Sequence, residues 1–94
     1  MNDPTTRSTP FIRCDHVDLH LFAVQSGIPL LDTLEHVAVY LSCAEALAHQ
    51  APTATRPEHC GSLYWASQQM LGTARALVQA SIDGLHAVHA GDEA

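Results

Sequence analysis

The sequence predicts a mainly α-helical protein, built as an antiparallel helical hairpin with a short strand before it. Three observations support this class. Apolar residues recur at spacings of three and four over residues 29–50, they do so again over residues 56–88, and a five-residue connector separates the two stretches. A connector this short holds its two helices side by side and antiparallel. Because a hairpin of this size has more apolar surface than it can bury alone, we expect two copies to form a four-helix bundle.

The first fourteen residues are predicted to be a disordered N-terminal arm. They contain Pro4 and Pro10 among several Thr and Ser residues, so they offer little apolar surface to offset the entropy of ordering. The helical-hairpin domain with its leading strand is then expected over residues 15–90. A tail over residues 91–94 completes the chain.

The leading strand is predicted over residues 17–24, where polar and apolar residues alternate. The alternation places Val17, Leu19 and Leu21 on one face. An isolated strand leaves backbone groups unpaired on both edges, so it needs a partner strand. The simplest partner is the same strand of a second chain in the dimer.

The first helix is predicted to begin at Pro29, whose fixed φ suits a first helical turn. Its broad apolar face includes Leu34, Val37 and Leu41, which we expect at the dimer interface. Pro52 disfavours helical geometry in the residue before it and ends this helix. The pattern Thr55-x-x-Glu58 is that of a capping box, which would start the second helix.

The second helix has an apolar stripe and an unusual back. The stripe is expected to be buried and contains Leu71, Val78, Ile82 and Leu85 among others. The back carries Trp65, Gln69, Gly72 and Ala76, with almost no charge, and Gly72 costs about 1 kcal/mol of helix propensity. We therefore predict a second contact surface, where small residues admit another helix and Trp65 is the anchor. The alternative is a surface tryptophan that lies over its own helix.

The charge and composition exclude several kinds of partner. The net charge is -6, from ten acidic residues against four arginines, so the chain has no basic patch for nucleic acid or an anionic membrane surface. The N-terminus lacks an apolar signal core, and the longest apolar run, residues 37–41, is too short for a bilayer. We expect a cytoplasmic protein. Its three widely spaced cysteines are typical of reduced thiols and are Cys14, Cys43 and Cys60.

A metal site is the alternative function, because Cys14, His16, Asp18 and His20 would share one face of the predicted strand. Same-face neighbours on a strand lie about 7 Å apart, so these groups do not easily converge on one ion. The leading prediction is therefore a homodimeric, non-enzymatic interaction or regulatory module without a cofactor. No nucleophile elbow or phosphate-binding loop indicates an enzyme. A small-molecule pocket is the least favoured alternative, since no polar set converges inside the predicted core.

Part of the chain resembles a known family. The segment over residues 21–35, with the pattern F-x-V-x-x-G-I-P at its start, continues into Leu41-Ser-Cys-Ala-Glu45. It is similar to a domain-of-unknown-function family of small proteobacterial helical-hairpin proteins. The second predicted helix resembles that family over residues 63–85. The resemblance implies a small, mostly helical protein and supplies no activity, cofactor or catalytic residue.

Overall fold

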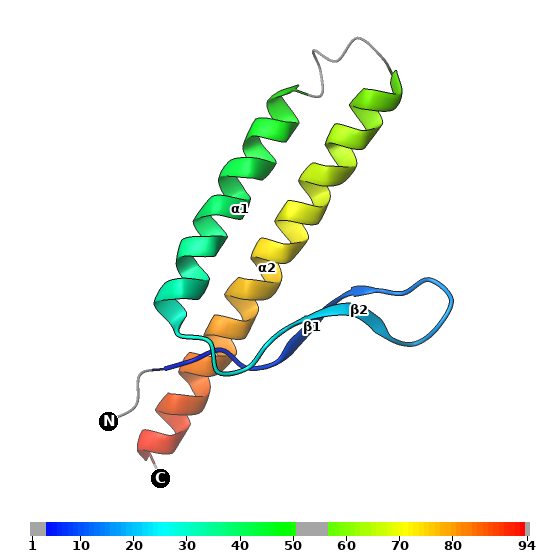
Figure 1. The fold of residues 1–94 in the computed structure, drawn as a ribbon. Helices are drawn as coiled ribbons and strands as arrows, with labels where there is room; N and C mark the ends of the chain where they lie inside the picture. The colour runs from blue at the N-terminus through cyan, green and yellow to red at the C-terminus, as the bar shows by residue number, and fades with distance from the viewer. Residues whose placement is uncertain (1–3, 51–56, 94) are drawn as a thin grey trace.

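The computed structural model describes residues 4–50 and 57–93, which form a β-hairpin followed by a helical hairpin (Figure 1). The elements are β1 (Thr9–Arg13), β2 (His20–Val24), α1 (Leu30–Gln50) and α2 (Pro57–Glu93). The mainly helical class and the two predicted helices are confirmed. The connector and Thr55 of the predicted capping box lie outside the described residues.

The two helices pack along one narrow seam. Val37 and Ala44 of α1 are buried, and Ala74 of α2 is buried as well. The hydroxyl of Ser67 donates a hydrogen bond to the carbonyl oxygen of Ala44 across the seam, at 3.1 Å. Small residues such as Ala44, Ser67 and Ala74 allow two helices to approach closely along such a seam.

The prediction of a disordered arm over residues 1–14 is wrong for the described part of that segment. Residues 9–13 form β1, which pairs antiparallel with β2 in a register that sets Phe11 opposite Phe22. Their rings stack with centroids 5.8 Å apart, a cross-strand pair of the kind that stabilises a sheet. Ile12 interrupts the extended backbone of β1 with a φ of 58°. Composition alone does not predict β1, because this strand depends on pairing with β2, which follows later in the chain.

The predicted strand is also shorter than expected and has a different partner. It spans His20–Val24 instead of residues 17–24, and residues 15–18 form bends at the tip of the hairpin. The amide of Cys14 donates to the carbonyl oxygen of Leu19 at 2.8 Å and closes this tip. The partner of β2 is β1 of the same chain, so pairing with a second copy is not needed to satisfy the backbone groups between the strands.

The segment before β1 is held against α2 by backbone hydrogen bonds. Thr6 is 3% exposed; its amide donates to the carbonyl oxygen of Ile28, and its hydroxyl donates to that of Gln25. The amide of Arg7 donates to the carbonyl oxygen of Ala80 on α2, at 3.1 Å. Thr5 lies so close to Gly84 that a β-carbon on Gly84 would overlap the Thr5 carbonyl. Hydrogen bonds and a small helical residue, with little apolar burial, therefore fix this segment.

The molecule is thin and its core is small. The whole molecule, β-hairpin included, spans 58 × 31 × 15 Å, and its two helices lie side by side in a single layer (Figure 1). The buried apolar residues of the described chain are small or medium in size, and all are Val or Ala: Val24, Val37, Ala44, Ala74, Ala76 and Ala80. Most domains bury their apolar faces between two layers. Here the β-hairpin packs on α2 and projects away from the two helices (Figure 1).

Neither of the two described helices contains an apolar stretch of the length needed to cross a bilayer.

Candidate functional site

The predicted interface residues of α1 fall in two places. Val37 is buried against α2 within one chain, so it is not available to a second copy. Leu34 and Leu41 point away from the seam and remain exposed. The predicted apolar face of α1 is therefore divided between the helical seam and an exposed strip beside it.

The predicted buried stripe of α2 contributes to the same exposed region. Six of the exposed apolar residues of the two helices form what we call the open helical face, and each is between 38% and 49% exposed: Leu34, Leu41, Leu71, Val78, Ile82 and Leu85. On α2 these residues follow spacings of seven, four and three, so they line one side of the helix. The sequence predicts that this stripe is buried, but in a single chain these residues remain partly exposed.

The open helical face lies on the side of the helical layer opposite the β-hairpin. With about 3.6 residues per turn, Ala76 and Ala80 fall on one flank of α2, and Val78 and Ile82 fall on the other. Ala76 and Ala80 pack against Val24 of β2, which fixes the flank that the β-hairpin covers. The flank with Val78 and Ile82 is left without a covering element among the described residues.

The back of α2 is covered in part, by the chain's own hairpin. Ala76 is buried beneath β2, so small residues do admit a neighbouring element there, but it is a β-hairpin and not a helix. Gly72 has open space around it, since a β-carbon at this position would meet nothing within 4 Å. The backbone of Thr5 comes close to α2 at Gly84 instead. The signal of this contact in the sequence is a glycine inside the second predicted helix, directly before Leu85 of the apolar stripe.

Trp65 and Gln69 stand beside an open groove between α2 and the far half of the β-hairpin. The groove also includes Ile12, Leu21 and Phe22 from the two strands. Trp65 is 65% exposed, so it is not covered by its own helix or by the hairpin. Arg13, Asp15 and His16 line the groove as well, so the structure places the predicted anchor at the rim of an exposed groove with both apolar and polar walls.

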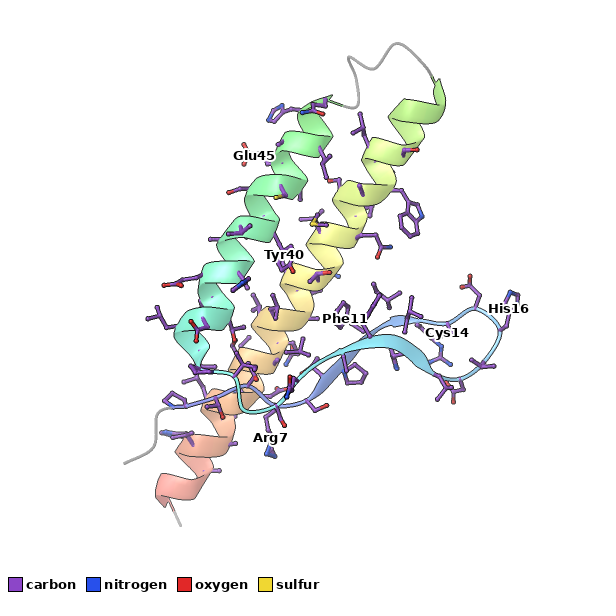
Figure 2. The ribbon with its side chains drawn as sticks, in the orientation of Figure 1. Arg7, Phe11, Cys14, His16, Tyr40 and Glu45 are labelled. Atoms are coloured by element: carbon purple, nitrogen blue, oxygen red, sulfur yellow. The ribbon has the colours of Figure 1, made fainter. Side chains whose placement is uncertain are left out.

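The proposed metal ligands lie at the tip of the β-hairpin, away from the helices, as Figure 2 shows for Cys14 and His16. Among the side chains that the structure describes, those of residues 4–50 and 61–90, no group of three or more His, Cys, Asp or Glu is placed to hold a metal ion. The carboxylate of Asp18 forms an exposed ion pair with Arg13 at 2.6 Å. Because residues 15–18 bend, the period-two spacing that placed these groups on one face does not apply.

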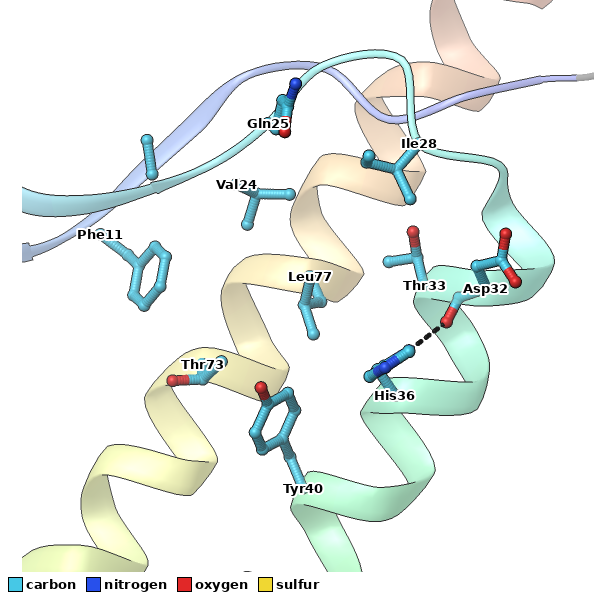
Figure 3. A pocket seen from close by; sticks show the side chains of 11 residues that line it. Phe11, Val24, Gln25, Ile28, Asp32, Thr33, His36, Tyr40, Thr73 and Leu77 are labelled. Atoms are coloured by element: carbon cyan, nitrogen blue, oxygen red, sulfur yellow. Dashed lines mark hydrogen bonds between the residues drawn. The ribbon is translucent and has the colours of Figure 1, made fainter.

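A pocket that the sequence did not predict lies between the β-hairpin and the two helices (Figure 3). Its volume is about 280 Å³, and apolar side chains from three elements and a loop line it, among them Phe11, Val24, Ile28 and Leu77. α1 contributes His36 and Tyr40 to the same pocket, and α2 contributes Thr73. The strands, the loop and the two helices that line the pocket are far apart in the sequence, and no spacing rule brings these segments together.

The polar groups at this pocket have defined hydrogen-bonding states. Nδ1 of His36 lies 2.8 Å from the carbonyl oxygen of Asp32 and must donate to it, since a carbonyl can only accept. The hydroxyl of Thr73 donates to the carbonyl oxygen of Gln69 at 2.9 Å. Among the described residues, the hydroxyl of Tyr40 has no hydrogen-bond partner. The pocket thus combines an apolar floor with one free hydroxyl and one imidazole nitrogen.

The comparisons with known proteins agree with the resemblance noted in the sequence. The model of a family described as a protein of unknown function, DUF3077, matches residues 5–88. No curated protein and no solved structure matches the chain. The matched range includes both strands, α1 and most of α2, and the chain therefore belongs to the DUF3077 family.

Proposed function

We propose that this protein is a non-enzymatic interaction or regulatory module that acts as a homodimer, with two helical hairpins joined through their open helical faces into a four-helix bundle. The observation that carries the proposal is the strip of six partly exposed Leu, Val and Ile side chains on one side of a single helical layer. Soluble monomers seldom leave so continuous an apolar strip in water. A second copy presents an identical strip, so pairing of the two chains buries both strips.

The amount of exposed surface supports a dimer of ordinary size. The accessible surface of the chain is 6909 Å², whereas a compact monomer of 10.1 kDa is expected to expose about 5300 Å². The excess is about 1600 Å² per chain. Permanent homodimers bury roughly 2000 Å² or more in total, so the excess is large enough to supply such an interface.

The chemistry of the surface also supports a protein partner over other classes. The net charge is -6 and the chain contains no lysine, so phosphate backbones and anionic lipids are unfavourable partners. We propose that the dimer works in the cytoplasm and needs no cofactor. Reduced thiols at Cys14 and Cys43, which form no disulfide, are compatible with that compartment.

The variant Ile82→Glu tests the dimer directly. Ile82 is partly exposed in the single chain, so a carboxylate there has a small effect on the monomer fold but would be buried without a partner in the dimer. We expect dimerisation to weaken by about 3 kcal/mol or more. Light scattering after size-exclusion chromatography measures the effect.

Val39→Glu is the matched control for this experiment. Val39 is exposed on the side of α1 that faces away from both the seam and the open helical face, so its variant should remain dimeric. If Ile82→Glu and Val39→Glu show the same mass distribution as the natural protein, the open helical face is not the dimer interface.

We propose that the groove beside Trp65 is where the dimer contacts another protein. An exposed tryptophan at the rim of a groove is a common anchor of protein interfaces, and this groove lies away from the open helical face. Proteins recovered from the native cell by the natural chain should be lost with Trp65→Ala and kept with Gln68→Ala, an exposed neighbour. Equal recovery with both variants would contradict this assignment.

A further inference from the structure

We propose that the pocket between the β-hairpin and the helices binds a small, neutral, mainly apolar molecule that carries a hydroxyl group, such as a phenol or a cyclic alcohol. The inference does not depend on the dimer. The pocket opens on the side of the helical layer that carries the β-hairpin, whereas the open helical face lies on the other side.

The size of the pocket sets the size of its ligand. Its volume of about 280 Å³ exceeds the cavity of about 150 Å³ that suffices to bind benzene in an apolar protein interior. One or two fused rings therefore fit. Phe11, Val24 and Leu77 supply apolar contacts from β1, β2 and α2, so such a ring would be enclosed from several directions (Figure 3).

Two polar groups of α1 define the chemistry of the ligand. Because Nδ1 of His36 donates to the Asp32 carbonyl, the Nε2 of a neutral imidazole is left as an acceptor. The Tyr40 hydroxyl is free to donate. Figure 3 shows the Tyr40 ring projecting from α1 toward Leu77 and Thr73. A ligand hydroxyl can donate to the first group or accept from the second, which a purely apolar molecule cannot do.

The charge of the site disfavours an anionic ligand. The Asp32 side chain lies at the rim of the pocket, and the whole chain carries a net charge of -6. None of the described residues that line the pocket is a Lys or Arg that could pair with a carboxylate or a phosphate. A neutral hydroxyl fits this arrangement better than either anion.

The test uses 2-naphthol as the probe. Its binding is monitored by NMR of the isotope-labelled natural protein. We expect saturable shifts of amide signals that surround the pocket, with a dissociation constant between about 10 µM and 1 mM for a ligand of this size. The comparison probe is 2-methoxynaphthalene, which has the same rings but cannot donate a hydrogen bond. It should bind about three to ten times more weakly.

Two variants locate the binding site and its polar contact. Tyr40→Phe removes the hydroxyl alone and should weaken 2-naphthol binding about three- to tenfold. Leu77→Trp fills the cavity and should abolish binding, while Leu47→Trp, at a half-buried position of α1 outside the pocket, should retain it. Circular dichroism shows whether each variant is folded.

Several results would overturn the proposal. These are the absence of saturable shifts around the pocket, shifts confined to the open helical face, or unchanged binding in a folded Leu77→Trp variant. Equal affinity for the two probes together with no effect of Tyr40→Phe would reject recognition of the hydroxyl. If Leu77→Trp does not fold, the shift map and Tyr40→Phe still decide the question.

Discussion

Single residues with small side chains determine how the N-terminal segment meets α2. Ala80 is 0% exposed, and its carbonyl oxygen accepts a hydrogen bond from the amide of Arg7 while Val24 packs beside it. One turn further along, Gly84 leaves room for the backbone of Thr5. The sequence indicated that small residues on α2 admit a neighbour. It could not identify the neighbour, because backbone hydrogen bonds such as those of Thr6 leave no pattern in side-chain spacing.

Alanine substitutions at two glycines of α2 test whether the N-terminal segment lies against Gly84 and whether the space around Gly72 is open. Gly84→Ala places a methyl group against the Thr5 backbone, so we expect it to lower the free energy of unfolding by about 1–3 kcal/mol. Gly72→Ala, in the same helix with nothing within 4 Å, should raise it by roughly 0.5–1 kcal/mol through helix propensity. Urea denaturation at one fixed protein concentration measures both. A stabilised Gly84→Ala variant would show that the N-terminal segment does not lie on Gly84.

The helices were predictable from the sequence to within a few residues, but the β-hairpin was not. The predicted helix over residues 29–50 begins one residue before α1, and the second predicted helix ends at about residue 88, whereas α2 continues to Glu93. Helical periodicity is local, which explains this success. β1 contains a proline and only two apolar residues, Phe11 and Ile12, and its formation depends on pairing with β2. The pocket depends on the same packing and was missed for the same reason.

The docking of the β-hairpin on α2 is tested by overpacking the contact between them. Ala80→Leu inserts a larger side chain where Ala80 and Val24 now meet, which should weaken docking by about 1–3 kcal/mol. Hydrogen exchange of β1 and β2 amides should accelerate by roughly five- to 150-fold, with less change in α1. Ala46→Leu, on an exposed part of α1, serves as the control. Unchanged exchange in both strands would mean that the hairpin does not pack on Ala80.

At the scale of the whole molecule, one side of the helical layer carries the β-hairpin and the other side is open. The β-hairpin, the pocket and the Trp65 groove belong to the first side, and the open helical face forms the second. The sequence predicted too much apolar surface for one copy. Large aliphatic residues of both helices are exposed in the single chain, because two helices side by side form one layer and no second helical layer covers them among the described residues. The large aliphatic residues of α1 and α2 therefore remain available for a partner.

The most direct test of this account is the mass of the natural protein measured by sedimentation equilibrium between about 1 and 100 µM. A permanent homodimer keeps its mass over such a dilution, because interfaces of this size commonly bind in the nanomolar range. The account predicts a species of twice the 10.1 kDa chain mass over most of that range. A folded, helical species of 10.1 kDa at every concentration would contradict it.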